Sequence, residues 1–173
     1  MKAIICLCHG YGHTCTFFLD GVARKIGSAG YGVYALDYPG FGLSGLHGYI
    51  PSFDTLVSDV AEHFTKVKGN PEHRGLPTFL FGQSMGGAVA VKCSFNVITY
   101  KDKPQLQTAL EVLNTTQEIE RCLEEVSLPM IILHGEADLV TDLAVSKALY
   151  EKAKSQDKKA LPLQRCVPHY LGR

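Results

Sequence analysis

The chain has 173 residues, with 17 Lys+Arg and 17 Asp+Glu, so its formal net charge is +0 with neutral histidines. Hydrophobic residues make up 46% and charged residues 20% of the chain, as is usual for a globular protein. This length suits one domain, and we predict a single domain over residues 1–173. The balanced charge gives no electrostatic reason to expect a nucleic acid as partner.

Targeting and metal-binding signals are not apparent in the sequence. No apolar run approaches the roughly 20 residues of a transmembrane helix, and the apolar run 4–8 is followed by no small-residue cleavage site. The six cysteines form no C-x-x-C pair, so we expect neither a metal site nor a cofactor. We therefore predict free thiols in a cytoplasmic protein, although a sorting signal in a longer amino terminus stays open.

Apolar runs that end in glycine-rich or polar turns predict the strands of a sheet. These runs are 4–8, 33–37, 78–81 and 126–133. Apolar residues at helical spacing predict helices, at 16–29, 53–67, 85–93 and 144–154. Continuous apolar strands that alternate with helices indicate an α/β fold, a mostly parallel sheet with helices on both faces.

Two other segments are less regular. Within 101–125, apolar residues at helical spacing predict two short helices, the second running to Val126. The polar stretch 152–159 predicts a turn or loop, and 160–173 has no clear period.

The strongest chemical signal is Gly82-Gln83-Ser84-Met85-Gly86, which matches G-x-S-x-G between a predicted strand and a predicted helix. Such a turn holds the serine in a strained conformation and exposes its hydroxyl, and Gly82 and Gly86 leave room for the tight backbone. The Met85 N–H then lies at a helix amino terminus, where an oxyanion would form. We interpret Ser84 as a nucleophile.

A serine nucleophile needs a base, and the base needs an orienting acid. In this motif's fold the acid and the histidine follow the serine in that order. Asp138, past the end of a later predicted strand, is our candidate acid, whereas Glu136 and Asp142 are interpreted as solvated loop carboxylates. His169 follows Asp138 and is the candidate base by elimination.

The remaining histidines receive other interpretations. His63 and His73 are expected at the surface, and His134 is expected to be structural. His9, Gly10 and Gly12 belong to the loop after the first predicted strand. In that loop the glycines let the Tyr11 N–H face the site as a second oxyanion donor.

Taken together, these motifs resemble the monoacylglycerol lipase-like branch of the α/β-hydrolases. The segments that carry the resemblance are 9–12, 37–44, 82–87 and 134–138. Segments 45–51 and 115–120 resemble the plant members in particular, which include caffeoylshikimate esterases and lysophospholipase-like proteins. The resemblance implies a serine carboxylester hydrolase, with Ser84 as nucleophile, Asp138 as acid and the N–H groups of Tyr11 and Met85 as the oxyanion hole.

The sequence also departs from the pattern of that family. Met1 coincides with the first recognisable strand, so we expect a reduced fold without the family's opening strands. Ser84 and Asp138 are too close in sequence for a full lid, and we interpret 97–125 as a remnant of that cap. Pro162 and Pro168 fit a central strand badly, and the closing helix is expected to be missing.

Three functional hypotheses remain. The first is an esterase that acts on acylglycerols, lysophospholipids or aromatic acyl esters; a site without a full lid favours small soluble esters. The second is a catalytically impaired, truncated isoform or a non-catalytic member that binds a small molecule. The third is a chain that does not fold stably. A peripheral membrane contact and the oligomeric state stay open.

Overall fold

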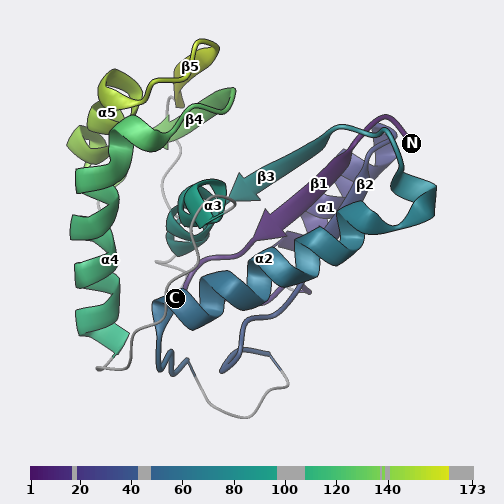
Figure 1. Cartoon of the computed structure of the whole chain (residues 1–173), viewed down its shortest axis with the longest axis horizontal. Coiled ribbons are helices and arrows are strands. Elements are labelled where there is room, and N and C mark those ends of the chain that lie inside the picture. Colours follow the sequence, from purple (N-terminus) through teal and green to yellow (C-terminus); the bar gives the residue numbers. More distant parts are fainter. Residues whose placement is uncertain (17–18, 43–47, 97–107, 137, 139–140, 164–173) are drawn as a thin grey trace. The chain divides into compact units, whose positions relative to one another are not determined.

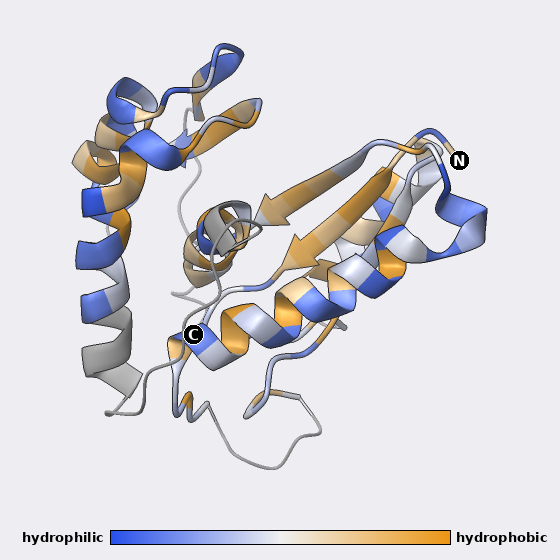
Figure 2. Ribbon diagram, in the orientation of Figure 1, coloured by the Kyte–Doolittle hydropathy of each residue, from blue (hydrophilic) through white to orange (hydrophobic). Residues whose placement is uncertain are grey.

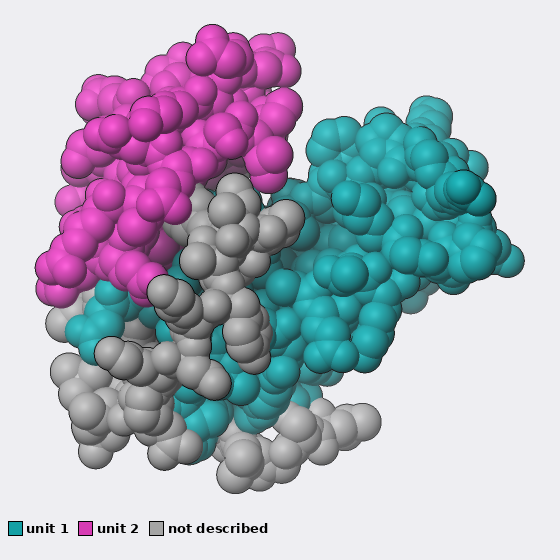
Figure 3. Space-filling view, viewed as in Figure 1, with its two compact units in different colours: residues 1–116 teal, residues 117–173 magenta. Residues whose placement is uncertain are grey.

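The computed structural model describes residues 1–16, 19–42, 48–96, 108–136, 138 and 141–163 (Figure 1). Contacts divide the chain into two compact units, Met1–Thr116 and Gln117–Arg173, which Figure 3 colours separately. The single domain over residues 1–173 stays a prediction. None of the described helices combines the length and apolar content that a membrane span requires.

Unit 1 contains a three-stranded parallel sheet that confirms the first three predicted strands. Its strands are β1 (Ile4–Cys8), β2 (Gly32–Ala35) and β3 (Thr78–Gly82). The order is β2-β1-β3, so the first strand lies in the centre. Cys8 is aligned with Gly82, which brings the carboxyl ends of β1 and β3 together. In a parallel α/β sheet this end is where ligands bind.

Three helices cover this sheet, close to the predicted ranges. They are α1 (Leu19–Ser28), α2 (Phe53–Gly69) and α3 (Met85–Asn96). Helix α2 begins after Ser52, whose side-chain oxygen accepts a hydrogen bond from the Thr55 N–H at 3.2 Å. This bond satisfies one of the amides left free at a helix start.

The core of unit 1 lies between the sheet and helices α2 and α3. Alternate residues of β1 point into it and meet apolar side chains of the two helices. Its fully buried members include Ile4, Cys6, Cys8, Val57, Val60 and Val89. Helix α1 lies behind the sheet and α2 in front of it in Figure 1. Helices therefore lie on both faces of the sheet, as the continuous apolar strands predict, although Phe79 and Leu80 of β3 are exposed.

One of the two histidines expected at the surface is buried. His73 ends the short 3-10 helix η1 (Pro71–His73) and is 4% exposed. Its Nδ1 lies 2.5 Å from the Val67 carbonyl oxygen, and its Nε2 lies 2.8 Å from the Tyr34 hydroxyl. The prediction was wrong because the η1 turn folds the ring back onto the end of α2.

Helix α4 (Thr108–Cys122) crosses the boundary between the units and replaces the two short helices predicted for this region. No glycine or proline interrupts residues 108–122, so the helix continues to the 3-10 turn η2 (Leu123–Glu125). The Val126 N–H closes this turn on the Leu123 carbonyl oxygen at 3.3 Å. The fourth strand therefore begins later than predicted.

Unit 2 holds β4 (Met130–Gly135), α5 (Leu143–Lys152) and β5 (Lys158–Leu163). Strands β4 and β5 form a two-stranded parallel sheet. Strand β5 was not predicted, because the polar stretch 152–159 favours a turn and Pro162 fits a central strand badly.

Pro162 is tolerated because of its place in the β4–β5 ladder. The Glu136 N–H donates to the Leu163 carbonyl oxygen at 3.2 Å, so Leu163 turns its backbone groups toward β4. Backbone groups alternate in direction along a strand, which turns the Pro162 nitrogen away from β4. The missing N–H of proline therefore costs this ladder no hydrogen bond.

Candidate active site

The Ser84 turn has the strained geometry expected of an activated serine. Ser84 follows β3 directly and precedes α3, and its φ is +54°. Among the described residues, no other non-glycine residue has a positive φ. Such a conformation is uncommon for an L-residue and persists only when the surroundings enforce it. Ser84 is also exposed, so its hydroxyl is accessible.

Close backbone packing enforces this turn. A Cβ on Gly82 would overlap the backbone of Gly86, and a Cβ on Gly86 would overlap the Cys8 carbonyl group. The N–H groups of Gly86 and Gly87 turn back onto the carbonyl oxygens of Gln83 and Ser84, at 2.9 and 2.7 Å. Both outer glycines of the motif are therefore sterically required.

The loop after β1 lies against the same turn. The Gln83 N–H donates to the Cys8 carbonyl oxygen at 3.1 Å. A Cβ placed on Gly10 would lie 3.2 Å from the Ser84 Cβ and 2.6 Å from the Gln83 Oε1. Gly10 therefore lets the two loops touch, which brings the backbone of the 9–12 loop next to the serine.

The peptide between Gly10 and Tyr11 is held in a defined orientation. Its carbonyl oxygen lies 2.9 Å from the His9 Nδ1 and accepts the His13 N–H at 3.2 Å. No described peptide bond is cis, so the Tyr11 N–H points opposite to this carbonyl. The Tyr11 amide is thus directed away from these two donors, and its role in the oxyanion hole stays a prediction.

His9 holds this peptide as a neutral ring. Its Nε2 accepts the Tyr38 N–H at 3.2 Å, which leaves the proton on Nδ1 for the Gly10 carbonyl. The ring is fully buried and stacks on Tyr38 with a centroid distance of 3.8 Å. Burial lowers the pKa of His9, which favours the neutral form.

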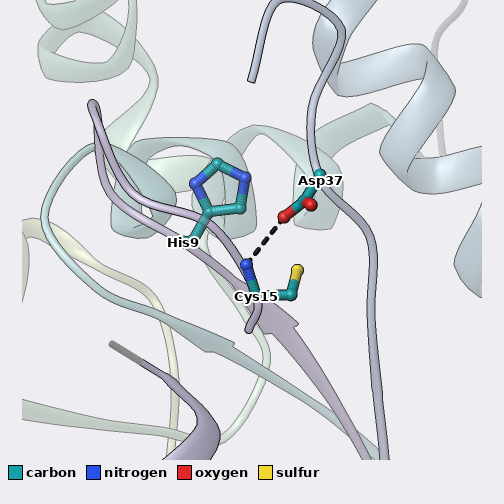
Figure 4. Close-up of side chains that lie close together, drawn as sticks. All are labelled: His9, Cys15 and Asp37. Atoms are coloured by element: carbon teal, nitrogen blue, oxygen red, sulfur yellow. Dashed lines mark hydrogen bonds between the residues drawn. The ribbon is translucent and has the colours of Figure 1, made fainter. Parts of the chain in front are cut away.

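His9, Cys15 and Asp37 form the one group of potential metal ligands among the described residues, with ligand atoms within 4.8 Å of one another (Figure 4). Asp37 accepts the Cys15 N–H at 2.7 Å, and both nitrogens of the His9 ring are engaged as described above. The His9 nitrogens and an Asp37 carboxylate oxygen are thus used in the protein's own hydrogen bonds. The group therefore fastens the 9–15 loop to the end of β2.

Three residues that support the site were not predicted as such from the sequence: Asp37, Cys15 and Tyr38. An acidic residue just after an apolar strand was the available signal, because such a position lies at the functional edge of a parallel sheet. Asp37 could have been found in this way. The contacts of Cys15 and Tyr38 depend on how the loops fold together, which no local pattern shows.

The candidate acid Asp138 lies in unit 2, in the turn after β4. Its two carboxylate oxygens accept the N–H and the hydroxyl of Thr141. Asp142 caps α5 by accepting the Ala144 N–H at 2.8 Å, so it is more than the solvated loop carboxylate we expected. His134 is 2.9 Å from the Ser146 hydroxyl and joins β4 to α5, in agreement with a structural role.

The candidate triad is divided between different parts of the chain. Ser84 and both oxyanion candidates, Tyr11 and Met85, belong to unit 1, and Asp138 belongs to unit 2. His169 lies outside the described residues. The structure therefore assembles the serine turn and the 9–12 loop, whereas the roles of Asp138 and His169 stay predictions.

Comparison with known proteins agrees with this geometry. The sequence model of the family described as hydrolase 4, serine aminopeptidase S33, matches residues 1–102 and 96–166. Caffeoylshikimate esterase of Arabidopsis thaliana is 25% identical over 226 residues, covering 91% of this chain and 68% of that protein. Human monoglyceride lipase is 25% identical over 221 residues, covering 91% of this chain and 72% of the lipase.

Solved structures show the same fold. A soluble variant of the Saccharomyces cerevisiae monoglyceride lipase, in complex with a substrate analogue, superposes with a TM-score of 0.79 at 14% identity. That match covers 95% of this chain and 78% of the yeast chain. The alignments to the curated relatives span more positions than the 173 residues of this chain, so part of each relative has no counterpart here. The fold is thus a reduced α/β-hydrolase.

Proposed function

Because the chain belongs to the serine aminopeptidase S33 family of α/β-hydrolases, we propose that it hydrolyses carboxylic esters through an acyl-enzyme formed on Ser84. The observation that carries this proposal is the φ of +54° at an exposed serine between β3 and α3. A backbone this strained, held by glycines packed against the neighbouring strand, is what presents a nucleophilic hydroxyl.

In the proposed reaction the Ser84 Oγ bonds to the acyl carbon while a base takes its proton. The N–H groups of Tyr11 and Met85 donate to the oxyanion, and the alcohol leaves with the proton from the base. Water then attacks the acyl-enzyme, and the acid is released. We assign the base to His169 and its orienting carboxylate to Asp138, which completes the order serine, acid, histidine.

The substrate class follows from the relatives and from the reduced fold. The relatives are named for a caffeoylshikimate ester and for monoglycerides, so a small molecule with an acyl ester is the common element. Part of each relative is missing here, and a site that is less enclosed excludes water poorly and holds a long acyl chain weakly. We therefore propose faster turnover of acetyl esters than of long-chain esters.

A fluorophosphonate probe tests the central step, because it reacts with a serine only when a base and an oxyanion hole activate the hydroxyl. The folded protein should be labelled, Ser84→Ala should abolish labelling, and Ser94→Ala on the same helix should leave it unchanged. A folded protein that is not labelled would reject the proposal and favour a non-catalytic small-molecule binder. With active protein, faster cleavage of a palmitoyl than an acetyl ester would reject the substrate class.

A further inference from the structure

A single threonine in unit 2 holds both oxygens of the Asp138 carboxylate. The Thr141 N–H donates to the Asp138 Oδ1 at 3.1 Å, and the Thr141 hydroxyl donates to the Asp138 Oδ2. Two donors on different oxygens resist rotation of the carboxylate about its Cβ–Cγ bond. The orientation of the candidate acid is therefore fixed by one neighbouring residue.

The backbone on each side of this pair is fixed in turn. Figure 2 draws β4 largely in the hydrophobic colour, and the turn that carries Asp138 follows the end of this strand. The Asp138 N–H donates to the Gly135 carbonyl oxygen at 3.0 Å and closes this turn. Thr141 directly precedes Asp142, which caps α5 through the Ala144 N–H. The pair thus joins the end of β4 to the start of α5.

Burial does not account for the side-chain bond between the two residues. Thr141 is exposed, so water could satisfy its hydroxyl without Asp138. The bond instead goes to a charged group, and hydrogen bonds to ionised carboxylates are shorter and stronger than those between neutral groups. Its effect therefore falls on the carboxylate rather than on the packing of the core.

The role of this contact rests on the proposed function, in which Asp138 orients the histidine base. We propose that Thr141 is a positioning residue for that reaction, which holds the Asp138 carboxylate ionised and in one orientation. The acid of a triad keeps the imidazole in one tautomer and stabilises the imidazolium that forms. Hydrogen bonds to a carboxylate favour its charged form. An ionised carboxylate has about four acceptor sites, so the two bonds from Thr141 leave capacity for a histidine N–H.

The hydroxyl can be removed with little change of shape. Thr141→Val keeps the backbone N–H and a branched side chain but loses the donor to the Asp138 Oδ2. Loss of one hydrogen bond to a charged group corresponds to roughly a tenfold change or more. With p-nitrophenyl acetate as substrate, kcat should fall by roughly tenfold and KM should change less than about twofold, because the imidazolium forms only in the reaction. Thr141→Ser restores the hydroxyl and should return kcat to near the wild-type value.

Two further variants separate this role from a general effect on the fold. Thr65→Val is the matched control, because it removes an exposed threonine hydroxyl that donates to the Ala61 carbonyl oxygen of α2 at 2.7 Å. It should leave kcat and KM unchanged. Asp138→Ala should lower kcat at least as much as Thr141→Val, since Thr141 acts through that carboxylate. Urea unfolding of every variant checks that each is folded under the conditions of the assay.

The outcomes that overturn the proposal differ from those that reject the proposed function. An unchanged kcat in Thr141→Val overturns it, and so does a folded Thr141→Ser that is no more active than Thr141→Val. If Asp138→Ala is more active than Thr141→Val, the threonine does not act through this carboxylate, and the proposal fails. A folded wild-type protein that a fluorophosphonate does not label rejects the proposed function itself, and this role of Thr141 with it.

Discussion

The two adjacent glycines after Ser84 should respond in opposite ways to the same substitution. Gly86 and Gly87 both lie in the first turn of α3. In Gly86→Ala the new Cβ would overlap the Cys8 carbonyl group and would lie 2.7 Å from the His9 carbonyl oxygen. In Gly87→Ala the nearest atom is the Gly82 carbonyl oxygen at 4.0 Å, an ordinary contact.

The magnitudes follow from packing and helix propensity. Extra atoms forced into a packed region typically cost about 1–3 kcal/mol. The atoms that a Cβ at Gly86 would meet are backbone atoms of the central strand and the loop after it, which cannot easily move. We therefore take the steric cost of Gly86→Ala at the upper end of this range, about 3 kcal/mol, before the gain in helix propensity is subtracted. Exchange of glycine for alanine in a helix gains at most about 1 kcal/mol. Gly86→Ala should therefore lower the free energy of unfolding by about 2 kcal/mol, whereas Gly87→Ala should raise it by up to about 1 kcal/mol.

Urea unfolding followed by circular dichroism measures both variants against the wild type, with the slope of the transition as a check on two-state behaviour. Gly86→Ala should also lose fluorophosphonate labelling under conditions in which it is still folded, because the turn that presents Ser84 must shift. The reasoning would be refuted if the two substitutions changed stability equally, or if Gly86→Ala kept full stability and labelling.

Three further predictions concern unit 1. Since burial lowers the pKa of His9 in the folded state, the unfolded chain binds more protons, and stability should fall as the pH drops from 7 to 5. The slope of stability against pH, measured from urea midpoints, should be smaller in His9→Asn than in His63→Asn. Equal slopes in the two variants would contradict this role of His9. Ser52→Ala should cost about 1 kcal/mol in the same assay by removing the α2 cap, and an unchanged midpoint would exclude that role. Burial raises the pKa of three core thiols: that of Cys6 to about 11, that of Cys93 to about 12, and that of Cys8 as well. Because the thiolate is the reactive form, iodoacetamide at pH 8 should modify these cysteines only in urea, as measured by peptide mass spectrometry. Modification of these thiols in the folded protein would show that this core opens readily.

The sequence predicted the elements that carry a strong local pattern. The apolar runs at 4–8 and 78–81 became β1 and β3, because short continuous apolar runs bounded by turn signals favour the strands of a parallel sheet. The G-x-S-x-G motif likewise predicted a strained serine turn, since its glycines and flanking elements are all local in sequence.

Local patterns failed where a distant contact determines the structure. Pro162 argues against a strand by itself, but the ladder register turns its nitrogen away from β4. His73 reads as a surface residue, but the Tyr34 hydroxyl meets its ring from a strand 39 positions away. In each case the partner, rather than the residue's own neighbourhood, decides the outcome.

By itself, therefore, the sequence determined an α/β fold with a strained serine at a strand-to-helix turn. Only the tertiary structure decided how that serine is supported: the neutral His9 ring fixes the Gly10–Tyr11 peptide, and Asp37 fastens the loop through the Cys15 amide. These supports join chain segments that lie far apart in the sequence. Hydrogen bonds of this kind exist only after the sheet has aligned the ends of its strands, so no local pattern encodes them.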